Sequence, residues 1–311
     1  MGRLLGFFAA PMLIGFVLAS QALAAPLRVV ASFSILGDLV RQVGNLHAAG
    51  GGEGGEGGEG LSVVTLVGPN GDAHVFEPSP ADARAVRGAA LVVINGFGLE
   101  GWMLRLFQST GYRGPVVVAS AGVAPRTGSA DGHSGLDPHA WQNVVNVKVY
   151  VRNIVEGLVK VDPGHAAAYR ANGTAYEAKL DTLDGEVRAA FARLSPGRRE
   201  VITSHDALGY FGDAYGLTLL APEGFSTDSE PSAKGVAALI DQIRRMRSRA
   251  VFVENMSDPR LIRQIAKETG TKLGGQLFSD SLSPVNGPAA TYLDMIRHNT
   301  RLIVDALSGP Q

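Results

Sequence analysis

The chain has 311 residues, with 28 Lys and Arg against 29 Asp and Glu, a formal net charge of −1, 45% hydrophobic residues and no cysteine. The near-neutral charge argues against a nucleic-acid-binding protein, which normally carries a basic face. The lack of cysteine excludes disulfides, thiol catalysis, cysteine-ligated zinc and a lipid anchor on an N-terminal cysteine. The length and the hydrophobic content are sufficient for one large domain or for two lobes of ordinary size.

The first 24 residues have the pattern of a cleavable secretory signal peptide. Arg3 is their only charged residue, an almost wholly apolar run follows over residues 4–19, and residues 22–24 read Ala-Leu-Ala, a small-x-small sequence of the kind that signal peptidase cleaves. The apolar run is shorter than the about 20 residues that a membrane span needs. We therefore predict a signal peptide over 1–24, with an N-terminal membrane anchor as the alternative, and a periplasmic mature protein without a lipid anchor.

Short β-branched runs alternate with longer amphipathic stretches in the rest of the chain, which is typical of an α/β fold with parallel sheets. In the first half we expect strands at 27–33, 61–67, 91–95 and 116–120, and helices at 35–44, 79–87, 101–110 and 143–161. A longer helical stretch follows at 164–194 and stops before a Ser-Pro-Gly sequence. In the second half we expect strands at 200–203, 218–221, 250–254 and 276–278, and helices at 207–215, 232–246, 258–269 and 287–307.

The restart of this pattern after one long helix predicts two lobes. We place an N-terminal α/β lobe at 25–162, the linking long helix at 163–195 and a C-terminal α/β lobe at 196–311. The expected fold class is therefore α/β, with two lobes built on mostly parallel sheets and joined by one long helix.

Residues 50–60 read GGGEGGEGGEG and form a low-complexity segment. Such a segment cannot bury an apolar face, so we expect a flexible, solvated loop. Glu53, Glu56 and Glu59, with His47 upstream, could recruit a cation, but carboxylates on a glycine chain are not preorganised for one.

Four polar segments that each come shortly after an apolar run contain the residues His74, His139, His205 and Asp280. In open parallel sheets, ligand groups collect at the carboxyl ends of the strands. Two of these residues belong to each half of the chain, so we expect all four to meet in the cleft between the lobes. Three neutral imidazoles and one carboxylate make a four-coordinate site for a borderline cation, and the pattern therefore predicts a metal site.

Three acidic residues, Asp72, Asp137 and Asp206, lie one or two positions from these histidines. Their carboxylates could accept hydrogen bonds from the imidazole rings and orient them. They could equally cap turns, and the sequence does not decide between the two roles.

The strings GDAHVFEPSP, LDPHAW, SHDALGYF, EPSAK and LFSDSLS resemble those of the zinc/manganese solute-binding proteins of bacterial ABC transporters. The likeness runs over essentially the whole mature chain. It implies a rigid linking helix, a metal held between the lobes by His74, His139, His205 and Asp280, and local ordering of loops instead of wide hinge closure. It also implies an ABC transporter permease in the inner membrane as the partner that takes the metal.

In the family that the chain resembles, the third ligand position is His in zinc-type members and Glu in manganese-type members. His205 occupies that position, and imidazole suits zinc, whereas manganese favours carboxylate and carbonyl oxygens. We therefore expect one Zn²⁺ per chain as the transported ligand. Four protein ligands leave no open position for a water nucleophile, so we expect capture of the metal and no enzymatic activity.

The chain departs from the family pattern in two places. Many zinc-type members carry a long loop rich in His and acidic residues, whereas residues 124–136 offer only Asp131 and His133. His133 could hand metal to the main site as an accessory residue, or it could be an exposed loop histidine. The tract at 50–60 looks like an insertion relative to the family.

Three alternatives to zinc delivery stay open from the sequence. They are a manganese- or iron-binding member of the same family, a metal-stabilised adhesin, and a secreted zinc hydrolase with Asp280 as its base. We further expect a monomer, a periplasmic metallochaperone as a second candidate partner, and no nucleic-acid partner.

Overall fold

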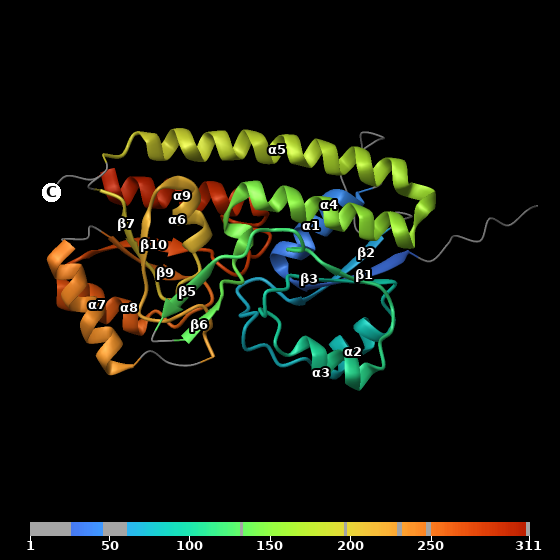
Figure 1. Ribbon diagram of the computed structural model, residues 1–311, viewed down its shortest axis with the longest axis horizontal. Helices are drawn as coiled ribbons and strands as arrows, with labels where there is room; N and C mark the ends of the chain where they lie inside the picture. The colour runs from blue at the N-terminus through green and yellow to red at the C-terminus, as the bar shows by residue number, and fades with distance from the viewer. Residues whose placement is uncertain are drawn as a thin grey trace, which may run out of the picture.

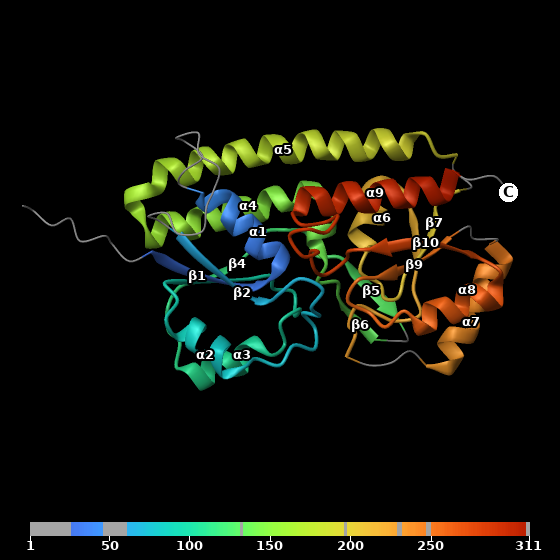
Figure 2. The ribbon, with the colours of Figure 1, turned by 180° about the vertical axis from the view of Figure 1, so that it is seen from behind.

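The structure is a computed structural model that describes residues 26–45, 61–130, 133–195, 198–228, 232–246 and 250–308. The predicted signal peptide, the glycine-rich tract, His47 and Asp131 lie outside these residues. Two parallel sheets stand side by side, each covered by helices on both faces, and one long helix runs across both (Figures 1 and 2). Within the described ranges, no helix has both the length and the apolar character that crossing a bilayer requires.

The first sheet has the strand order β2-β1-β3-β4, with every pairing parallel. Its strands are β1 (Leu27–Phe33), β2 (Leu61–Val67), β3 (Leu91–Ile94) and β4 (Val116–Val118). Its helices are α1 (Ser34–Gly44), α2 (Pro80–Arg87), α3 (Met103–Thr110) and α4 (Val144–Val161). β1 is buried from Val29 onward because helices cover both faces of the sheet, which is why it reads as an apolar run without alternation.

The second sheet repeats this arrangement with the order β10-β9-β7-β8, again all parallel. Its strands are β7 (Glu200–Ile202), β8 (Thr218–Leu220), β9 (Ala250–Glu254) and β10 (Lys272–Leu277). Its helices are α6 (Gly209–Tyr215), α7 (Ala233–Met246), α8 (Arg260–Thr269) and α9 (Tyr292–Ser308). Ser232 caps α7, because its Oγ accepts the backbone N–H of Gly235 at 3.0 Å.

The long helix α5 (Ala166–Ala192) connects the two sheets and packs on α1 and α4 of the first and on α6 and α9 of the second (Figure 1). Its buried residues recur every three or four positions and so form one stripe along the helix: Tyr169, Gly173, Tyr176, Leu180, Leu183, Val187 and Phe191. The predicted fold class, two parallel-sheet α/β lobes with a long helix, is confirmed. The residue limits of the two lobes stay a prediction.

The lobes also share a continuous apolar core around Trp141. The Trp141 ring packs on Phe33 with ring centroids 5.0 Å apart, and Tyr292 Oη donates a hydrogen bond of 2.8 Å to the Trp141 carbonyl. All three side chains are fully buried. Because the core crosses from one sheet to the other at this point, a relative movement of the lobes would have to break it.

Three local expectations were wrong. Residues 124–136 were treated as a loop, but within this stretch β5 (Thr127–Ala130) and β6 (His133–Leu136) form an antiparallel hairpin. β10 begins before the expected 276, because a bulge at Gly275, with φ +121°, keeps the strand paired through a Gly-Gly sequence that normally indicates a turn. α9 begins at Tyr292 and not at 287, because Thr291 caps it: Thr291 Oγ1 accepts the Asp294 backbone N–H at 3.2 Å, and Asp38 Oδ2 of α1 accepts the Tyr292 backbone N–H at 2.8 Å.

Substitutions at two glycines of α5 test how closely this helix packs on α4. A Cβ at Gly173 would lie 2.6 Å from Val155 Cγ2 of α4, whereas a Cβ at the exposed Gly185 would meet nothing within 4 Å. We expect Gly173→Ala to lower the free energy of unfolding by about 1 kcal/mol, because overpacking outweighs the gain in helix propensity. We expect Gly185→Ala to raise it by about 0.5–1 kcal/mol. Urea unfolding of the two variants measures both; a stabilised Gly173→Ala protein would contradict the close approach of α4 and α5.

Candidate metal centre

Four side chains from the ends of four strands or loops meet between the two sheets. His74 follows β2, His139 precedes a short 3₁₀ helix (Ala140–Gln142), His205 follows β7 and Asp280 follows β10. One potential ligand atom from each lies within 4.8 Å of all the others. The structure therefore brings together the four residues that the sequence singled out.

The distances inside this group are those of a compact cage. His74 Nε2 lies 3.3 Å from His139 Nε2 and 3.2 Å from Asp280 Oδ2. His205 Nε2 lies 3.0 Å from the same Asp280 oxygen, and His139 Nε2 lies 3.6 Å from Asp280 Oδ1. One cation at the centre could contact all four side chains, which is the arrangement of a closed four-coordinate site.

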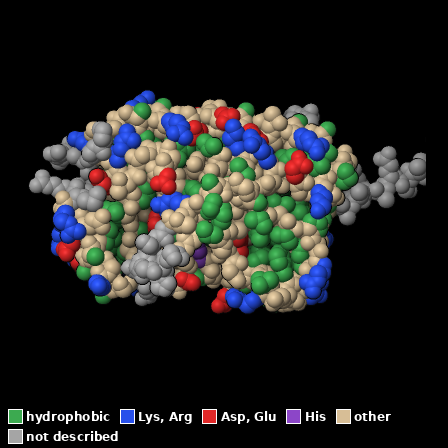
Figure 3. Space-filling model, viewed as in Figure 1, with side chains coloured by type: hydrophobic (Ala, Val, Ile, Leu, Met, Phe, Trp, Pro, Cys, Tyr) green, Lys and Arg blue, Asp and Glu red, His purple; other side chains and the backbone are tan. Residues whose placement is uncertain are grey.

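The cage is almost closed to solvent. The side chains of His139, His205 and Asp280 are fully buried, and that of His74 is 4% exposed. Figure 3 shows a small patch of histidine colour in a recess near the middle of one face. His74 is therefore the ligand on the solvent side of the cage.

Asp280 carries the strongest indication that the cage binds a cation. Both of its carboxylate oxygens are buried, and neither accepts a hydrogen bond of ordinary geometry from the described residues, although His74 and His205 stand at ion-pair distance. A buried carboxylate without hydrogen bonds is costly, since its lost hydration is not replaced. A divalent cation coordinated by these oxygens would remove that cost.

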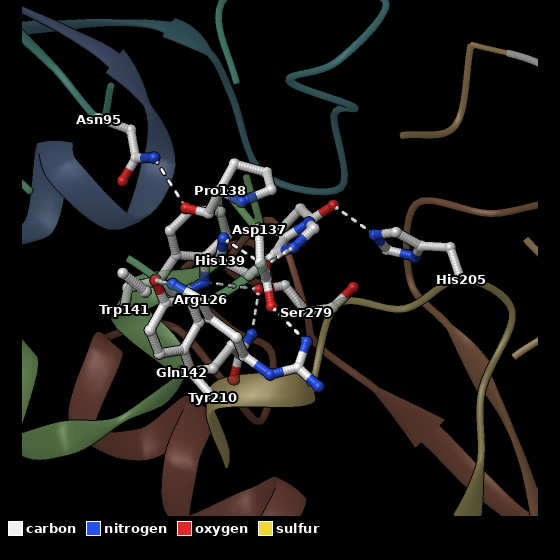
Figure 4. A network of polar contacts seen from close by, with 12 residues as sticks. Asn95, Arg126, Asp137, Pro138, His139, Trp141, Gln142, His205, Tyr210 and Ser279 are labelled. Carbon is white, nitrogen blue, oxygen red and sulfur yellow. Dashed lines mark hydrogen bonds and ion pairs between the residues drawn. The ribbon is translucent and has the colours of Figure 1, made fainter. Parts of the chain in front are cut away.

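Two further carboxylates hold the imidazole rings. Asp137 Oδ1 lies 2.8 Å from His139 Nδ1 and also accepts the His139 backbone N–H at 2.9 Å (Figure 4). Glu254 Oε2 lies 2.8 Å from His205 Nδ1, while its Oε1 accepts the backbone N–H groups of Ser204 and His205. At His139, an Nδ1–H that points at Asp137 leaves the lone pair of Nε2 facing the cage, which is the tautomer that a metal needs. At His205, Nδ1 and Glu254 stand at ion-pair distance without hydrogen-bond geometry.

The three acidic neighbours of the histidines have different roles. Asp137 orients a ring, as one of the two hypotheses proposed. Asp72 instead stabilises the turn, because its Oδ1 accepts the backbone N–H of His74 at 2.8 Å. Asp206 makes no hydrogen bond to a ligand ring within the described residues; burial raises its pKa, and the charge of Arg126 opposes that rise.

Sequence reasoning missed Glu254, which is 49 positions from the ring that it orients. The available signal was an acidic residue at the end of the apolar strand β9, at the same sheet edge as the ligands. His133 begins β6 opposite Ala130 in the hairpin. Its side chain lies outside the described part of the structure, so an accessory role of His133 stays a prediction.

The segments that carry the ligands are tied to one another across the lobes. Trp141 Nε1 and Gln142 Nε2, which follow His139, both donate to the carbonyl of Ser279, at 2.9 and 2.7 Å (Figure 4). On another side of the cage, the Asn70 backbone N–H donates to the Leu282 carbonyl at 3.1 Å. The cage is therefore preorganised, since the backbone on both sides of it is fixed by bonds that involve no ligand atom.

The charges in the cage favour exchange of a proton for a metal. Burial lowers the pKa of His205, but the charges of Glu254 and Asp280 outweigh this effect and raise the pKa well above 6.5. Burial raises the pKa of Asp280, but the neighbouring histidines, His205 foremost, outweigh it and lower the pKa well below 3.8. Before a metal arrives, Asp280 is ionised and His205 carries the proton that a metal must displace.

The chain matches, over residues 29–306, the model of a family described as the periplasmic component A of a zinc-uptake complex. It is 32% identical over 283 residues to the manganese-binding lipoprotein MntA of Halalkalibacterium halodurans, which covers 91% of this chain and 89% of the relative. It is 31% identical over 270 residues to the iron-binding protein YfeA of Yersinia pestis, and the match covers 86% of this chain and 82% of YfeA. The periplasmic zinc-binding protein TroA of Treponema pallidum has a similar structure, with a TM-score of 0.82 and 28% identity over 91% of this chain and 99% of that one.

The raised pKa of His205 predicts that metal binding displaces a proton from this ring. Affinity should therefore fall as the pH falls, by on the order of tenfold per pH unit for each proton displaced. Calorimetric titration with Zn²⁺ in two buffers of different ionisation enthalpy measures the number released. We expect Glu254→Gln to release fewer protons, because it removes the charge that contributes most to the raised pKa. The control is Glu186→Gln, which changes an exposed carboxylate paired with Arg297. Identical binding enthalpies of the parent in both buffers would show that no proton is released.

Proposed function

The chain belongs to this family of periplasmic metal-binding components of ABC transport, and we propose that its cargo is Zn²⁺, which it captures between its lobes and delivers to a membrane permease. The observation that carries the proposal is the cage of three imidazoles and one carboxylate around a common centre. His74, His139, His205 and Asp280 are the proposed ligands. Zn²⁺ accepts such mixed nitrogen and oxygen ligands in a closed tetrahedral geometry.

The choice of zinc rests on the ligand atoms. Three of the four are imidazole nitrogens, which suit zinc, copper and nickel, whereas manganese prefers carboxylate, carbonyl and water oxygens. The cage offers one carboxylate, and Asp137 and Glu254 are each already engaged at the Nδ1 atom of a ring. Cu²⁺ and Ni²⁺ fit the same ligand chemistry, so supply of the metal in the periplasm also contributes to selection.

Manganese and iron are the second candidates. Relatives at 31–32% identity are named as manganese-binding and iron-binding proteins, so overall similarity does not select one metal. The ligand set of this chain distinguishes the candidates, so the test of the proposal changes one of these residues, His205.

Capture fits the site better than catalysis. Four protein ligands complete a tetrahedral sphere and leave no position for a reactive water, which disfavours the secreted hydrolase. The family consists of transport components. A bound cation would bridge residues of both lobes and stabilise the native state by mass action.

We place the mature protein free in the periplasm. MntA is named a lipoprotein, but this chain has no cysteine to carry a lipid. The predicted signal peptide at 1–24 supplies export, an ABC permease in the inner membrane is the proposed acceptor, and a periplasmic metallochaperone is a second proposed partner.

Metal analysis of the exported protein, purified without chelator, tests the proposal. We expect about one zinc per chain, lost for the most part in His205→Ala, because three ligands and an unbalanced Asp280 hold zinc poorly. We expect His205→Glu to shift competition between Zn²⁺ and Mn²⁺ toward Mn²⁺, since it adds a second carboxylate. The control is His165→Ala, a half-exposed histidine paired with Asp162 outside the cage.

Two results would contradict the proposal. If the parent protein contains mainly manganese or iron, the cargo is one of these metals and the proposal of zinc is wrong. Zinc that is retained in full by His205→Ala would show that the metal is bound elsewhere.

A further inference from the structure

Arg126 stands at the base of the hairpin β5–β6, next to the residue that orients His139. Its carbonyl accepts the Asp137 backbone N–H at 2.8 Å, which extends the hairpin pairing by one residue beyond Thr127 and Leu136. Its guanidinium Nη1 lies 3.0 Å from Asp137 Oδ2, the oxygen that does not face His139. Backbone and side chain of Arg126 therefore both hold Asp137.

The Asp137 carboxylate is fully buried and bridges a cation to a ligand ring, with Oδ2 on Arg126 and Oδ1 on His139 (Figure 4). Removing one partner of a buried ion pair leaves an uncompensated charge, which is unfavourable for as long as that charge stays buried. Without the guanidinium, the carboxylate would gain by turning toward solvent, and the His139 ring would lose its fixed orientation.

The other side of Arg126 is held by α6 of the second lobe. Its Nε lies 3.0 Å from Asp213 Oδ2, and its backbone N–H donates to Tyr210 Oη at 2.7 Å. Gly209 provides the space for the guanidinium, because a Cβ there would lie 2.1 Å from Nη1. Asp213 is 71% exposed, so this outer ion pair contributes little energy, but it directs the planar guanidinium toward Asp137.

We propose that Arg126 is a positioning residue for metal capture, which anchors Asp137 to the second lobe and so holds the His139 ring toward the other ligands before the metal binds and while it is bound. This inference rests on the proposed metal-binding function. Arg126 touches no ligand atom itself and acts through Asp137. Its loss should weaken retention of the metal more than the stability of the fold.

The test compares Zn²⁺-loaded parent, Arg126→Gln and Arg126→Lys, with Arg152→Gln as the control, since Arg152 is an exposed arginine that forms an ion pair with Glu177 between α4 and α5. Stopped-flow mixing with excess chelator measures the rate of zinc loss. We expect Arg126→Gln to lose zinc about 10- to 100-fold faster, in the range of other residues that support metal ligands. Arg126→Lys should lose zinc at an intermediate rate, because its ammonium can pair with Asp137 but cannot at the same time donate to Asp213, as the planar guanidinium does.

Two further measurements separate positioning from a general structural role. The visible absorption of the Co²⁺-loaded protein should change in Arg126→Gln, because the coordination of His139 is disturbed, while the melting temperature of the metal-free protein stays close to that of the control. If Arg126→Gln does not fold, Gly209→Ala serves instead, since it displaces the guanidinium and keeps the charge; it should speed zinc loss in the same direction.

The outcomes are distinct. Parent-like zinc loss and an unchanged Co²⁺ spectrum in Arg126→Gln, or in Gly209→Ala where it replaces that variant, would overturn the role of Arg126 and leave the proposed function intact. A parent that binds neither Zn²⁺ nor Co²⁺ would overturn the proposed function and this inference together.

Discussion

The buried carboxylate of Asp280 sets the charge balance of the cage. It is ionised, fully buried and surrounded by three imidazole rings, and it lacks the hydrogen bonds that normally make a buried charge tolerable. Only a positive charge at the centre of the cage, whether the proton on His205 or a cation, compensates it. Metal capture is on this view the exchange of one compensating charge for another.

The fold supplies the rigidity that this exchange needs. Parallel strands end at one edge of each sheet, which brings ligands from distant parts of the chain to one place. The helix α5 and the shared core around Trp141 fix the two sheets so that the carboxyl ends of their strands face each other. Hydrogen bonds to Ser279 and Leu282 fix the backbone on both sides of the cage, and His74 is the one of the four proposed ligands whose side chain has any exposure.

Much of the fold followed from sequence patterns, because buried parallel strands and amphipathic helices have strong local signals. The meeting of His74, His139, His205 and Asp280 was also expected from the sequence, since each lies in a polar segment after an apolar run; that they are the ligands stays a proposal. The bulge of β10 was missed because it is set by the partner strand, whereas the start of α9 had a local signal in the cap at Thr291, which a contact with Asp38 of α1 reinforces. Glu254 and Arg126 were missed because their roles need tertiary contacts: Glu254 meets His205 only once β9 lies beside β7, and Arg126 bridges Asp137 and Asp213 only once the two lobes come together.

X-ray absorption spectroscopy of the zinc-loaded protein tests whether three imidazoles and the Asp280 carboxylate bind the metal, since it detects the atoms around the metal without mutation. The account predicts four nitrogen or oxygen neighbours at about 2.0–2.2 Å, with the outer-shell scattering of three imidazoles. A site with five or six oxygen-rich neighbours, or with fewer than three imidazoles, would show that the cage around Asp280 is not where the metal is bound.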